Sequence, residues 1–335
     1  MLSLADLAAR HRALSIIGMC KNAGKTTVLG ALLGPPERAG EGLALTSIGR
    51  DGESRDVVTD TPKPPVYIGR GALIATAEGL LPMCDATREI VGATGIHTPM
   101  GEVVIFRALS DGYVQLGGPS MNSQLAWLRE RFFVLGARRV VIDGAAGRRS
   151  LCSRAVAEST ILCVGASYHR DMGVVVQDAA HVCGLLSLPA LEHEQMERLP
   201  VDARYALLRP GGDVVVWEGG DMALWLKRMG GRGVLAAGGA VTDALPGGIM
   251  RSGIRPEGLT LVAGDASKLL LTRRAMEGWI RRGGRMAVRD TVELAAVTIN
   301  PVSAYGWRFD TRQFLETMAA AVAVPVVDVM GGYHA

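Results

Sequence analysis

The segment that most constrains the fold of this chain is "GMCKNAGKTT", residues 18–27. It follows an apolar run, Ala13–Ile17, and precedes a helical stretch, Val28–Leu33. A strand, a glycine-containing loop and a helix in this order bring backbone N–H groups and a helix N-terminus together around phosphate groups. The standard phosphate loop has four residues between its first glycine and the Gly-Lys pair, whereas this chain has five. We therefore expect a phosphate loop that departs from the standard pattern at its front.

Strand-like apolar runs alternate with helical stretches along the rest of the chain. The strand-like runs are 13–18, 43–48, 103–108, 138–143 and 161–166 in the first half, and 214–218, 234–239, 259–264, 294–300 and 324–329 in the second. The helical stretches are 26–33, 122–135, 172–186, 221–229, 268–281 and 311–321. Several runs are apolar throughout, as strands buried on both faces of a parallel sheet are. The alternation predicts an α/β protein with a P-loop NTPase-like parallel sheet flanked by helices, followed by a second α/β half.

A polar, proline-flanked stretch, Leu188–Pro200, is the best candidate for a domain boundary. It separates the phosphate loop and its neighbouring strands from the second series of strands. We accordingly predict a nucleotide-binding domain over residues 1–190 and a C-terminal α/β domain over residues 191–335.

The lysine and threonines of the loop stand at the offsets that nucleotide binding requires. In a phosphate loop, Lys25 would reach the β- and γ-phosphates of ATP or GTP, and Thr26 would hold Mg²⁺. Met19 takes the place of the first glycine, and Lys21 stands one position too close to Lys25 to match the extra lysine of deviant loops. The alternative is an ordinary β-α turn with a surface lysine. The candidate nucleotide-binding residues are Gly18, Asn22, Ala23, Gly24, Lys25, Thr26 and Thr27.

Hydrolysis needs a carboxylate for the metal or the attacking water, and two aspartates are candidates. Asp143 ends the buried run of "VVIDGAAGRR", where a carboxylate would emerge beside the phosphate loop and, with Thr26, hold Mg²⁺. Asp51 in "SIGRDGE" follows the strand after the loop helix, where a water- or metal-handling acid is expected. Both also fit ordinary Asp-Gly turns. Arg148 and Arg149 fit either phosphate stabilisation or solvated surface positions.

Two polar turns in the second half follow strand-like runs. They are "GDASK", residues 264–268, and "TINPVS", residues 298–303. Ligands of open α/β sheets bind at such carboxyl ends of strands. The amide of Asn300 would suit the edge of a nucleotide base, although Asn-Pro is also a common turn starter.

Charge and cysteine content exclude several other classes of protein. The net charge of +3 lacks the footprint of a nucleic-acid binder, and the pairs Arg273/Arg274 and Arg281/Arg282 fit a solvated helix face better than a binding patch. The five cysteines are widely spaced and mostly in apolar stretches, which favours buried thiols in a reducing cytoplasm. The apolar stretch near Pro325 is too short for a membrane helix, which needs about 20 residues. We expect a soluble cytoplasmic protein without a structural metal.

Four sequence blocks together resemble a known family. "SIIGMCKNAGKTTVL", "TSIGRDGE", "VVIDGAAGRRS" and "TINPVSAYG" are similar to P-loop proteins identified as the small ATPase subunit of the lysine 5,6-aminomutase reactivase. The similar blocks run from about Leu14 to Val329. The resemblance implies an ATP-driven helper that restores an adenosylcobalamin-dependent aminomutase, working with a MutS-like ATPase subunit. It would place ATP and Mg²⁺ on Gly24, Lys25 and Thr26.

Two classes of function remain open from the residues alone. The first is a nucleotide-driven conformational switch that acts on a protein partner through Asp51 and Asp143. The second is a small-molecule kinase or ATP-dependent ligase of the dethiobiotin-synthetase-like type. A kinase would need an acceptor pocket and often an arginine-bearing lid, for which Arg148, Arg149 and Arg154 are the candidates. The residues do not distinguish these classes, nor ATP from GTP.

Overall fold

The computed structural model describes Leu4, Asp6, Gly40, Gly331 and residues 10–34, 42–49, 65–146 and 153–329. The chain divides into two compact units. Unit 1 comprises Met1–Ala180 and Glu293–Ala335, and unit 2 comprises His181–Val292. Helix α4 (Met172–Leu186) contains the first point of division. Among the described residues, no helix is long and apolar enough to cross a bilayer.

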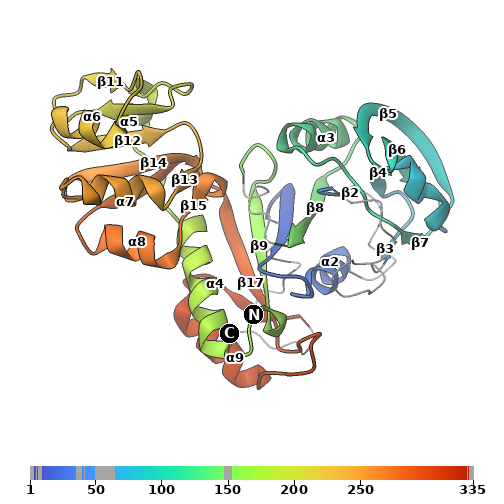
Figure 1. Cartoon of the computed structure of the whole chain (residues 1–335). Coiled ribbons are helices and arrows are strands. Elements are labelled where there is room, and N and C mark those ends of the chain that lie inside the picture. The colour runs from blue at the N-terminus through green and yellow to red at the C-terminus, as the bar shows by residue number, and fades with distance from the viewer. Residues whose placement is uncertain are drawn as a thin grey trace. The chain divides into compact units, whose positions relative to one another are not determined.

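The described part of unit 1 is built on one nine-stranded sheet with the order β18-β17-β9-β1-β8-β2-β4-β6-β5 (Figure 1). Its strands are β1 (Ala13–Gly18), β2 (Leu43–Ser47), β4 (Leu73–Ala77), β5 (Arg88–Thr98), β6 (Gly101–Ala108), β8 (Arg139–Ala146), β9 (Ser159–Gly165), β17 (Glu293–Asn300) and β18 (Val326–Asp328). All neighbouring pairs from β18 to β4 are parallel. The predicted parallel sheet is therefore present, and α/β is confirmed as the class of fold.

An antiparallel pair extends the sheet beyond the expected parallel strands. β6 pairs antiparallel with both β4 and β5, and the long β5 curves beside β6 (Figure 1). A small antiparallel pair, β3 (Val66–Ile68) and β7 (Gly112–Val114), accompanies them. The large sheet is thus mixed, with its parallel strands in the middle and its antiparallel pair at one edge.

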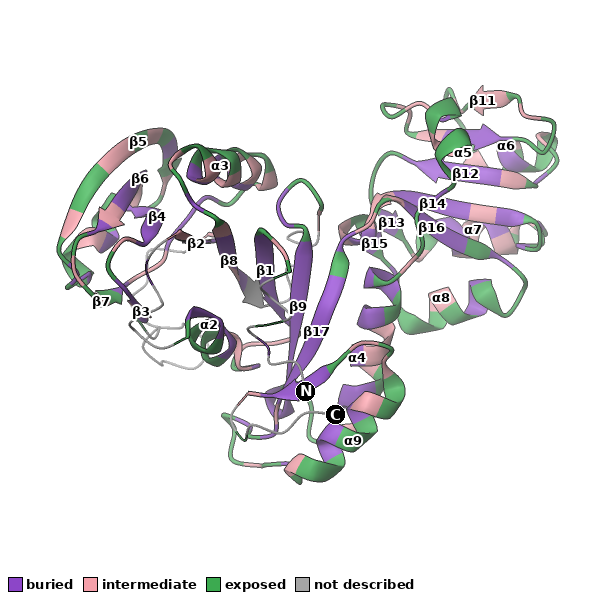
Figure 2. Cartoon of the chain, turned by 180° about the vertical axis from the view of Figure 1, so that it is seen from behind, coloured by how far each residue is buried: buried purple, intermediate pink, exposed green. Residues whose placement is uncertain are grey.

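The central strands are continuous apolar runs because they are covered on both faces. β1 and β9 are buried at every position, and Figure 2 shows β9 and most of β17 as buried. Helix α2 (Lys25–Leu33) buries Val28, Leu29, Leu32 and Leu33 in the same core as Leu14 and Ile16 of β1. Two further helices of unit 1, α3 (Asn122–Val134) and α9 (Thr311–Ala321), bury apolar residues of their own. The loop between β1 and α2 is thereby held between a buried strand and a packed helix.

Unit 2 is a smaller α/β assembly whose sheet has the order β11-β10-β12-β14-β16. These strands are β10 (Tyr205–Leu208), β11 (Val214–Val216), β12 (Gly233–Ala237), β14 (Leu259–Asp265) and β16 (Arg285–Asp290). The strands β12, β14 and β16 are parallel, and a short parallel pair joins β13 (Val241–Thr242) to β15 (Leu269–Leu270). The helices are α5 (His193–Arg198), α6 (Met222–Arg228), α7 (Ala244–Arg251) and α8 (Arg273–Ile280).

The division of the chain differs from the one expected at residues 190/191. Residues from Glu293 onward return to unit 1, because β17 pairs in parallel with β9 over most of its length. The stretch Leu188–Pro200 contains α5 and belongs to unit 2. The second α/β half is therefore an insertion between β9 and β17 rather than a C-terminal domain.

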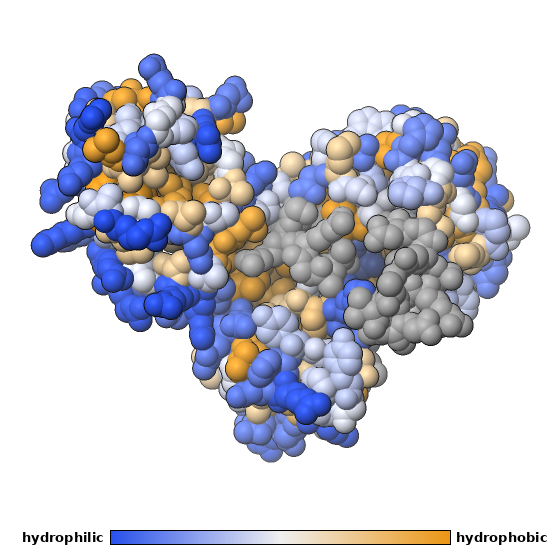
Figure 3. Space-filling view, viewed as in Figure 1, coloured by the Kyte–Doolittle hydropathy of each residue, from blue (hydrophilic) through white to orange (hydrophobic). Residues whose placement is uncertain are grey.

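The paired arginines of unit 2 lie on a solvated helix face. Arg273, Arg274, Arg281 and Arg282 are all exposed at or beside α8. Arg281 pairs with Glu277 at 3.9 Å, and Arg282 donates a hydrogen bond to the Gly278 carbonyl. Figure 3 shows hydrophilic side chains over this part of unit 2. Such contacts between neighbouring residues of one helix are typical of a solvent-exposed helix face.

Cysteine burial agrees with the expectation of free thiols. Cys84, Cys163 and Cys183 are buried and Cys20 is partly exposed, and none of these four described cysteines forms a disulfide. Cys152 lies outside the described residues.

Candidate functional site

The candidate phosphate loop, residues 19–24, connects β1 directly to the first turn of α2. Gly24 is the N-cap of α2, with φ 97° in the left-handed region, and no side chain caps the helix. The first backbone bond of the helix is Val28 N–H to the Gly24 carbonyl. The N–H groups of Lys25, Thr26 and Thr27 therefore have no partner within the helix, as at every helix N-terminus. Such N–H groups and the positive end of the helix dipole favour an anion.

The loop backbone turns sharply at two residues. Asn22 has φ 59°, and among the described residues it is the one non-glycine residue with a positive φ. Asparagine tolerates this region better than most residues, and Gly24 tolerates it without strain. The extra residue of the loop is thus accommodated by two left-handed turns just before the helix.

The Lys25 side chain folds back over the end of β1. A Cβ atom placed at Gly18 would lie 3.1 Å from the Nζ of Lys25. Gly18 therefore leaves room for the lysine side chain. This role does not require the standard number of residues between the first glycine and the Gly-Lys pair. Thr26 and Thr27 are exposed on the first turn of α2, and Lys25 is partly buried.

Asp143 lies beside this loop because β8 is the direct neighbour of β1. In the sheet, Asp143 is opposite Ile16 of β1 on one side and opposite Ser47 of β2 on the other. The residue as a whole is partly accessible, but its Oδ1 atom is buried and has no hydrogen-bond partner in the part of the chain that the structure describes. An unpartnered buried carboxylate oxygen is costly unless it meets a cation or a donor. The position therefore suits a metal ligand better than a simple turn residue.

The charge of Lys25 affects the pKa values of both Asp143 and Cys163. Burial raises the pKa of Asp143 to about 6, and the Lys25 ammonium and the Gly144 N–H act in the opposite direction. Burial likewise raises the pKa of the Cys163 thiol on β9 to about 12, against a hydrogen bond with Thr298 and the Lys25 charge. Because the same ammonium acts on groups in β8 and β9, it lies near the carboxyl ends of both neighbours of β1.

The ends of two further strands pack against the candidate phosphate loop. A Cβ atom at Gly165, the last residue of β9, would lie 2.8 Å from the Cα of Ala23. The Asn300 side chain, at the end of β17, donates a hydrogen bond from Nδ2 to the Asn22 carbonyl at 3.0 Å. The chain leaves β1 toward β2 and leaves β9 toward β17, in opposite directions along the sheet. The loop therefore lies at a topological switch point, the usual place for a ligand in such sheets.

A pocket of about 390 Å³ opens beside the loop, between the start of α2 and the end of β17. Its lining residues within the described chain are mostly apolar or carry neutral polar groups. They are Asn22, Ala23, Gly24, Thr27, Val28, Thr298, Ile299, Asn300, Pro301, Val302, Ser303, Ala304 and Val329.

Asn300 starts a turn, the second of the two roles that its sequence allows, and its amide also contacts the candidate phosphate loop. Its Nδ2 binds the Asn22 carbonyl, and its Oδ1 accepts the Val302 N–H at 3.1 Å. Both ends of the amide are therefore engaged within the protein, where a base edge would have to displace them. Asn300 fixes the left-handed turn at Asn22, so it is a positioning residue for the loop.

The structure brings together most of the predicted site and leaves part of it undescribed. Gly18, Asn22, Ala23, Gly24, Lys25, Thr26 and Thr27 form one loop and helix start, with Asp143 on the adjacent strand. Asp51, Arg148 and Arg149 lie outside the described residues. Asp265, in the other polar turn, belongs to unit 2 and bonds the backbone and hydroxyl of Ser267. Gly165 was missed, although a glycine directly after a buried apolar run is the signal that could have found it.

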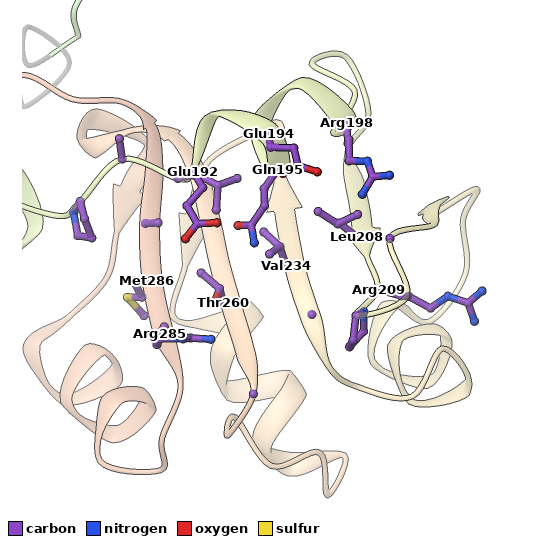
Figure 4. A pocket seen from close by; sticks show the side chains of 18 residues that line it. Glu192, Glu194, Gln195, Arg198, Leu208, Arg209, Val234, Thr260, Arg285 and Met286 are labelled. Carbon is purple, nitrogen blue, oxygen red and sulfur yellow. The ribbon is translucent and has the colours of Figure 1, made fainter.

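A larger cavity of about 560 Å³ lies in unit 2, on the sheet face beside α5 (Figure 4). Glu192 and Gln195 project toward Thr260 and Val234 of the sheet in this view. The cavity lies at the amino ends of β12, β14 and β16, the opposite end from the usual ligand position. Although this cavity is larger, the loop, Lys25 and Asp143 of unit 1 remain the better candidate for the functional site. The described residues contain no cluster of three or more His, Cys, Asp or Glu side chains arranged for a metal.

The raised pKa of Asp143 predicts a pH-dependent stability. The folded-state pKa of about 6 exceeds the ordinary aspartate value of 3.8, so the native protein binds more protons than the unfolded chain between these values. The free energy of unfolding of the metal-free protein should therefore fall as the pH rises from about 4 to 6, by up to roughly 3 kcal/mol. Asp143→Asn should lack this fall. Urea unfolding in EDTA from pH 4 to pH 8 measures it, and parallel pH profiles of variant and wild type would contradict it.

The contact of Gly165 with the loop predicts a sensitive position. Gly165→Ala would force Ala23 or Asn22 to move, since the new Cβ would stand 2.8 Å from the backbone of Ala23. We expect nucleotide affinity to fall at least tenfold. Gly30→Ala in α2 is the matched control, because a Cβ there meets nothing within 4 Å. The control should instead stabilise the helix by about 0.5–1 kcal/mol. Equal affinities of both variants for ATP, measured by titration calorimetry, would exclude a role for this contact.

Comparison with protein-family models, curated proteins and solved structures found no match for this chain.

Proposed function

We propose that this chain is a P-loop nucleotide-binding protein that hydrolyses ATP or GTP with Mg²⁺. The observation that carries the proposal is that the Lys25 ammonium, which lies over Gly18 at the end of β1, acts on the carboxylate of Asp143 on the neighbouring strand β8. A lysine for phosphate and a carboxylate for metal are the two side chains that a phosphate loop needs. The N–H groups at the start of α2 add the backbone part of the same cradle.

Each residue of the proposed site would have its own role in binding the nucleotide and the metal. Lys25 and the first N–H groups of α2 bind and orient the β- and γ-phosphates. Asp143 and Thr26 are the candidate ligands of Mg²⁺, and the unpartnered Oδ1 of Asp143 fits this role. When bound, Mg²⁺ neutralises charge on the phosphates. Asn300 and Gly165 hold the loop in place from the two neighbouring strand ends.

The biological role that we propose is reactivation of an adenosylcobalamin-dependent aminomutase, in cooperation with a MutS-like ATPase subunit. This part rests on the resemblance of four sequence blocks to the reactivase family. A helper that releases a damaged cofactor must bind two states of its client differently, and nucleotide must supply that difference.

Recovery of mutase activity after suicide inactivation tests this role. Wild-type protein should restore activity only when ATP, fresh adenosylcobalamin and the MutS-like subunit are all present. Its ATPase should be slow alone and faster with the inactivated enzyme. Lys25→Ala should restore nothing while remaining folded. Absence of recovery with every nucleotide, together with phosphorylation of a small acceptor in a metabolite screen, would replace the reactivase role with that of a kinase.

A further inference from the structure

Two loops of unit 2 border a hollow of about 240 Å³, which we call the basic hollow. One loop joins α6 to β12, and the other joins α7 to β14. Because β12 and β14 are parallel neighbours, the two loops meet at the amino ends of these strands, where Gly233 donates its N–H to the Gly258 carbonyl at 2.9 Å. The described residues that line the hollow are Lys227, Gly230, Gly231, Arg232, Gly253, Ile254, Arg255 and Glu257.

The lining of the basic hollow has an excess of positive charge. Lys227, Arg232 and Arg255 are exposed cations, and Glu257 is the one carboxylate of the described lining. Among the described residues, none of these four side chains forms an ion pair or a hydrogen bond. Three cations therefore border one hollow without a carboxylate bound to any of them.

Side chains of the neighbouring helix ends do not cancel this excess. Arg228 is the last residue of α6 and Arg251 the last residue of α7, and both are exposed. Near the end of α8, the carboxylate of Glu277 lies 3.9 Å from the guanidinium of Arg281. The three helix ends thus bring more cations than carboxylates to this edge of the sheet.

The carboxylates on the side of α5 are also accompanied by arginines. Asp213, between β10 and β11, accepts a hydrogen bond from Nε of Arg209 at 2.6 Å. The charged residues that line the larger cavity of unit 2 are Glu192, Glu194, Arg198, Arg209 and Arg285. This side of the sheet therefore supplies no surplus of negative charge to the basic hollow.

The helix ends account for only part of the positive charge. A cation in the last turn of a helix complements the helix dipole, as Lys227 does in α6. Arg232 and Arg255 lie beyond the last turns of α6 and α7. The carbonyls at these helix ends accept hydrogen bonds from loop N–H groups, for example those of Gly230 and Gly253. Arg232 and Arg255 are therefore available to a ligand.

We propose that the basic hollow binds a small multivalent phosphate, such as a di- or triphosphate group. Arginine and lysine side chains bind phosphate oxygens through charge-assisted hydrogen bonds. The glycines of both loops leave room for an anion to approach the backbone closely. The site lies in unit 2 and is separate from the phosphate loop, so it does not depend on the proposed function.

The lining favours this ligand over three others. Ile254 is the one apolar side chain of the described lining and is buried, so an aromatic or aliphatic ligand has little to pack against. A carboxylate brings a single charge to three cations, whereas a phosphate chain brings several. A nucleic acid needs phosphate contacts along a strand, and a hollow of about 240 Å³ holds only a short run of phosphates.

Titration calorimetry with inorganic tripolyphosphate in EDTA tests the site. The reference is the full chain with Lys25→Ala, which removes the lysine of the phosphate loop, and it should bind saturably. Adding Arg232→Gln/Arg255→Gln should raise Kd at least tenfold, because two contacts to phosphate are lost. Adding Glu257→Gln should lower Kd several-fold, because it removes a carboxylate beside the anion.

The matched control is Lys268→Gln/Arg274→Gln in the same reference. It removes two exposed cations of unit 2 that do not line the hollow, and it should leave Kd unchanged. Circular dichroism checks that each variant is folded.

A tripolyphosphate Kd that is the same in the Arg232/Arg255 variant and in the reference would overturn the proposal. An equal loss of affinity in the control would also overturn it, since binding would then follow overall charge. Binding of a labelled dT20 oligonucleotide that depends on both arginines, without binding of tripolyphosphate, would make the edge a nucleic-acid surface instead. Binding of ATP by the wild type is measured separately, so failure of one proposed site leaves the other standing.

Discussion

Lys25→Ala should weaken binding of ATP by about 10- to 100-fold. A charge-assisted contact to phosphate contributes roughly 1.5–3 kcal/mol, and each 1.4 kcal/mol is a factor of ten in Kd. The Lys25 ammonium lies over Gly18, at the end of β1 and close to Asp143, so no neighbouring lysine replaces it easily. Titration calorimetry with ATP and GTP, with and without Mg²⁺, measures the loss.

Lys21→Ala is the matched control for this variant. It removes the same charge from the same loop but not from the start of α2. Its effect on Kd should be several-fold smaller. If both lysine variants bind nucleotide as tightly as the wild type, the loop is an ordinary β-α turn.

Asp143→Asn should reduce Mg²⁺-dependent hydrolysis by about two orders of magnitude, the size of effect seen when one charge-stabilising group is removed from an active site. The substitution keeps the shape of the side chain and removes its charge. Binding of nucleotide without metal should survive, and should even strengthen slightly, because a buried negative charge near the phosphates is lost. Phosphate release and metal-free calorimetry together separate these effects.

Glu130→Gln provides the comparison for Asp143, since Glu130 is exposed on α3 and pairs only with its neighbour Arg129 at 2.6 Å among the described contacts. It should hydrolyse nucleotide at the wild-type rate. Hydrolysis by Asp143→Asn at that same rate would make Asp143 a turn residue.

The central part of the fold could be predicted because its strands are buried on both faces. β1, β8, β9 and β17 are largely apolar runs, and each was expected within three residues of its observed limits. Such runs identify strands without any knowledge of their partners. The helix after the loop was equally clear, since its buried residues repeat at helical spacing.

The parts that escaped prediction lack such local signals. β5 is an edge strand that is largely exposed and has two irregularities in its pairing with β6, so its sequence shows neither an apolar run nor clean alternation. α7 contains Pro246 and two glycines, which disfavour a helix in isolation. The proline is tolerated because it falls in the first turn, where its missing N–H has no partner to lose.

The domain division was missed for a different reason. The return of β17 to the side of β9 is a pairing between segments more than a hundred residues apart, about which a local pattern carries no information. The contact of Asn300 with the loop was missed in the same way. Its amide matched a base contact in type, but only the folded chain brings it next to the Asn22 carbonyl.

A crystal structure of the full chain with Mg²⁺ and a non-hydrolysable ATP analogue tests the proposed nucleotide site most directly. In it, the β- and γ-phosphates should accept hydrogen bonds from the N–H groups of Lys25 and Thr26 and from the Lys25 ammonium. Asp143 and Thr26 should lie on the metal side, with the hydrogen bond from Asn300 to Asn22 intact. Phosphates bound away from the start of α2, or a metal without Asp143 near it, would contradict the assignment of residues 18–27 as a phosphate loop.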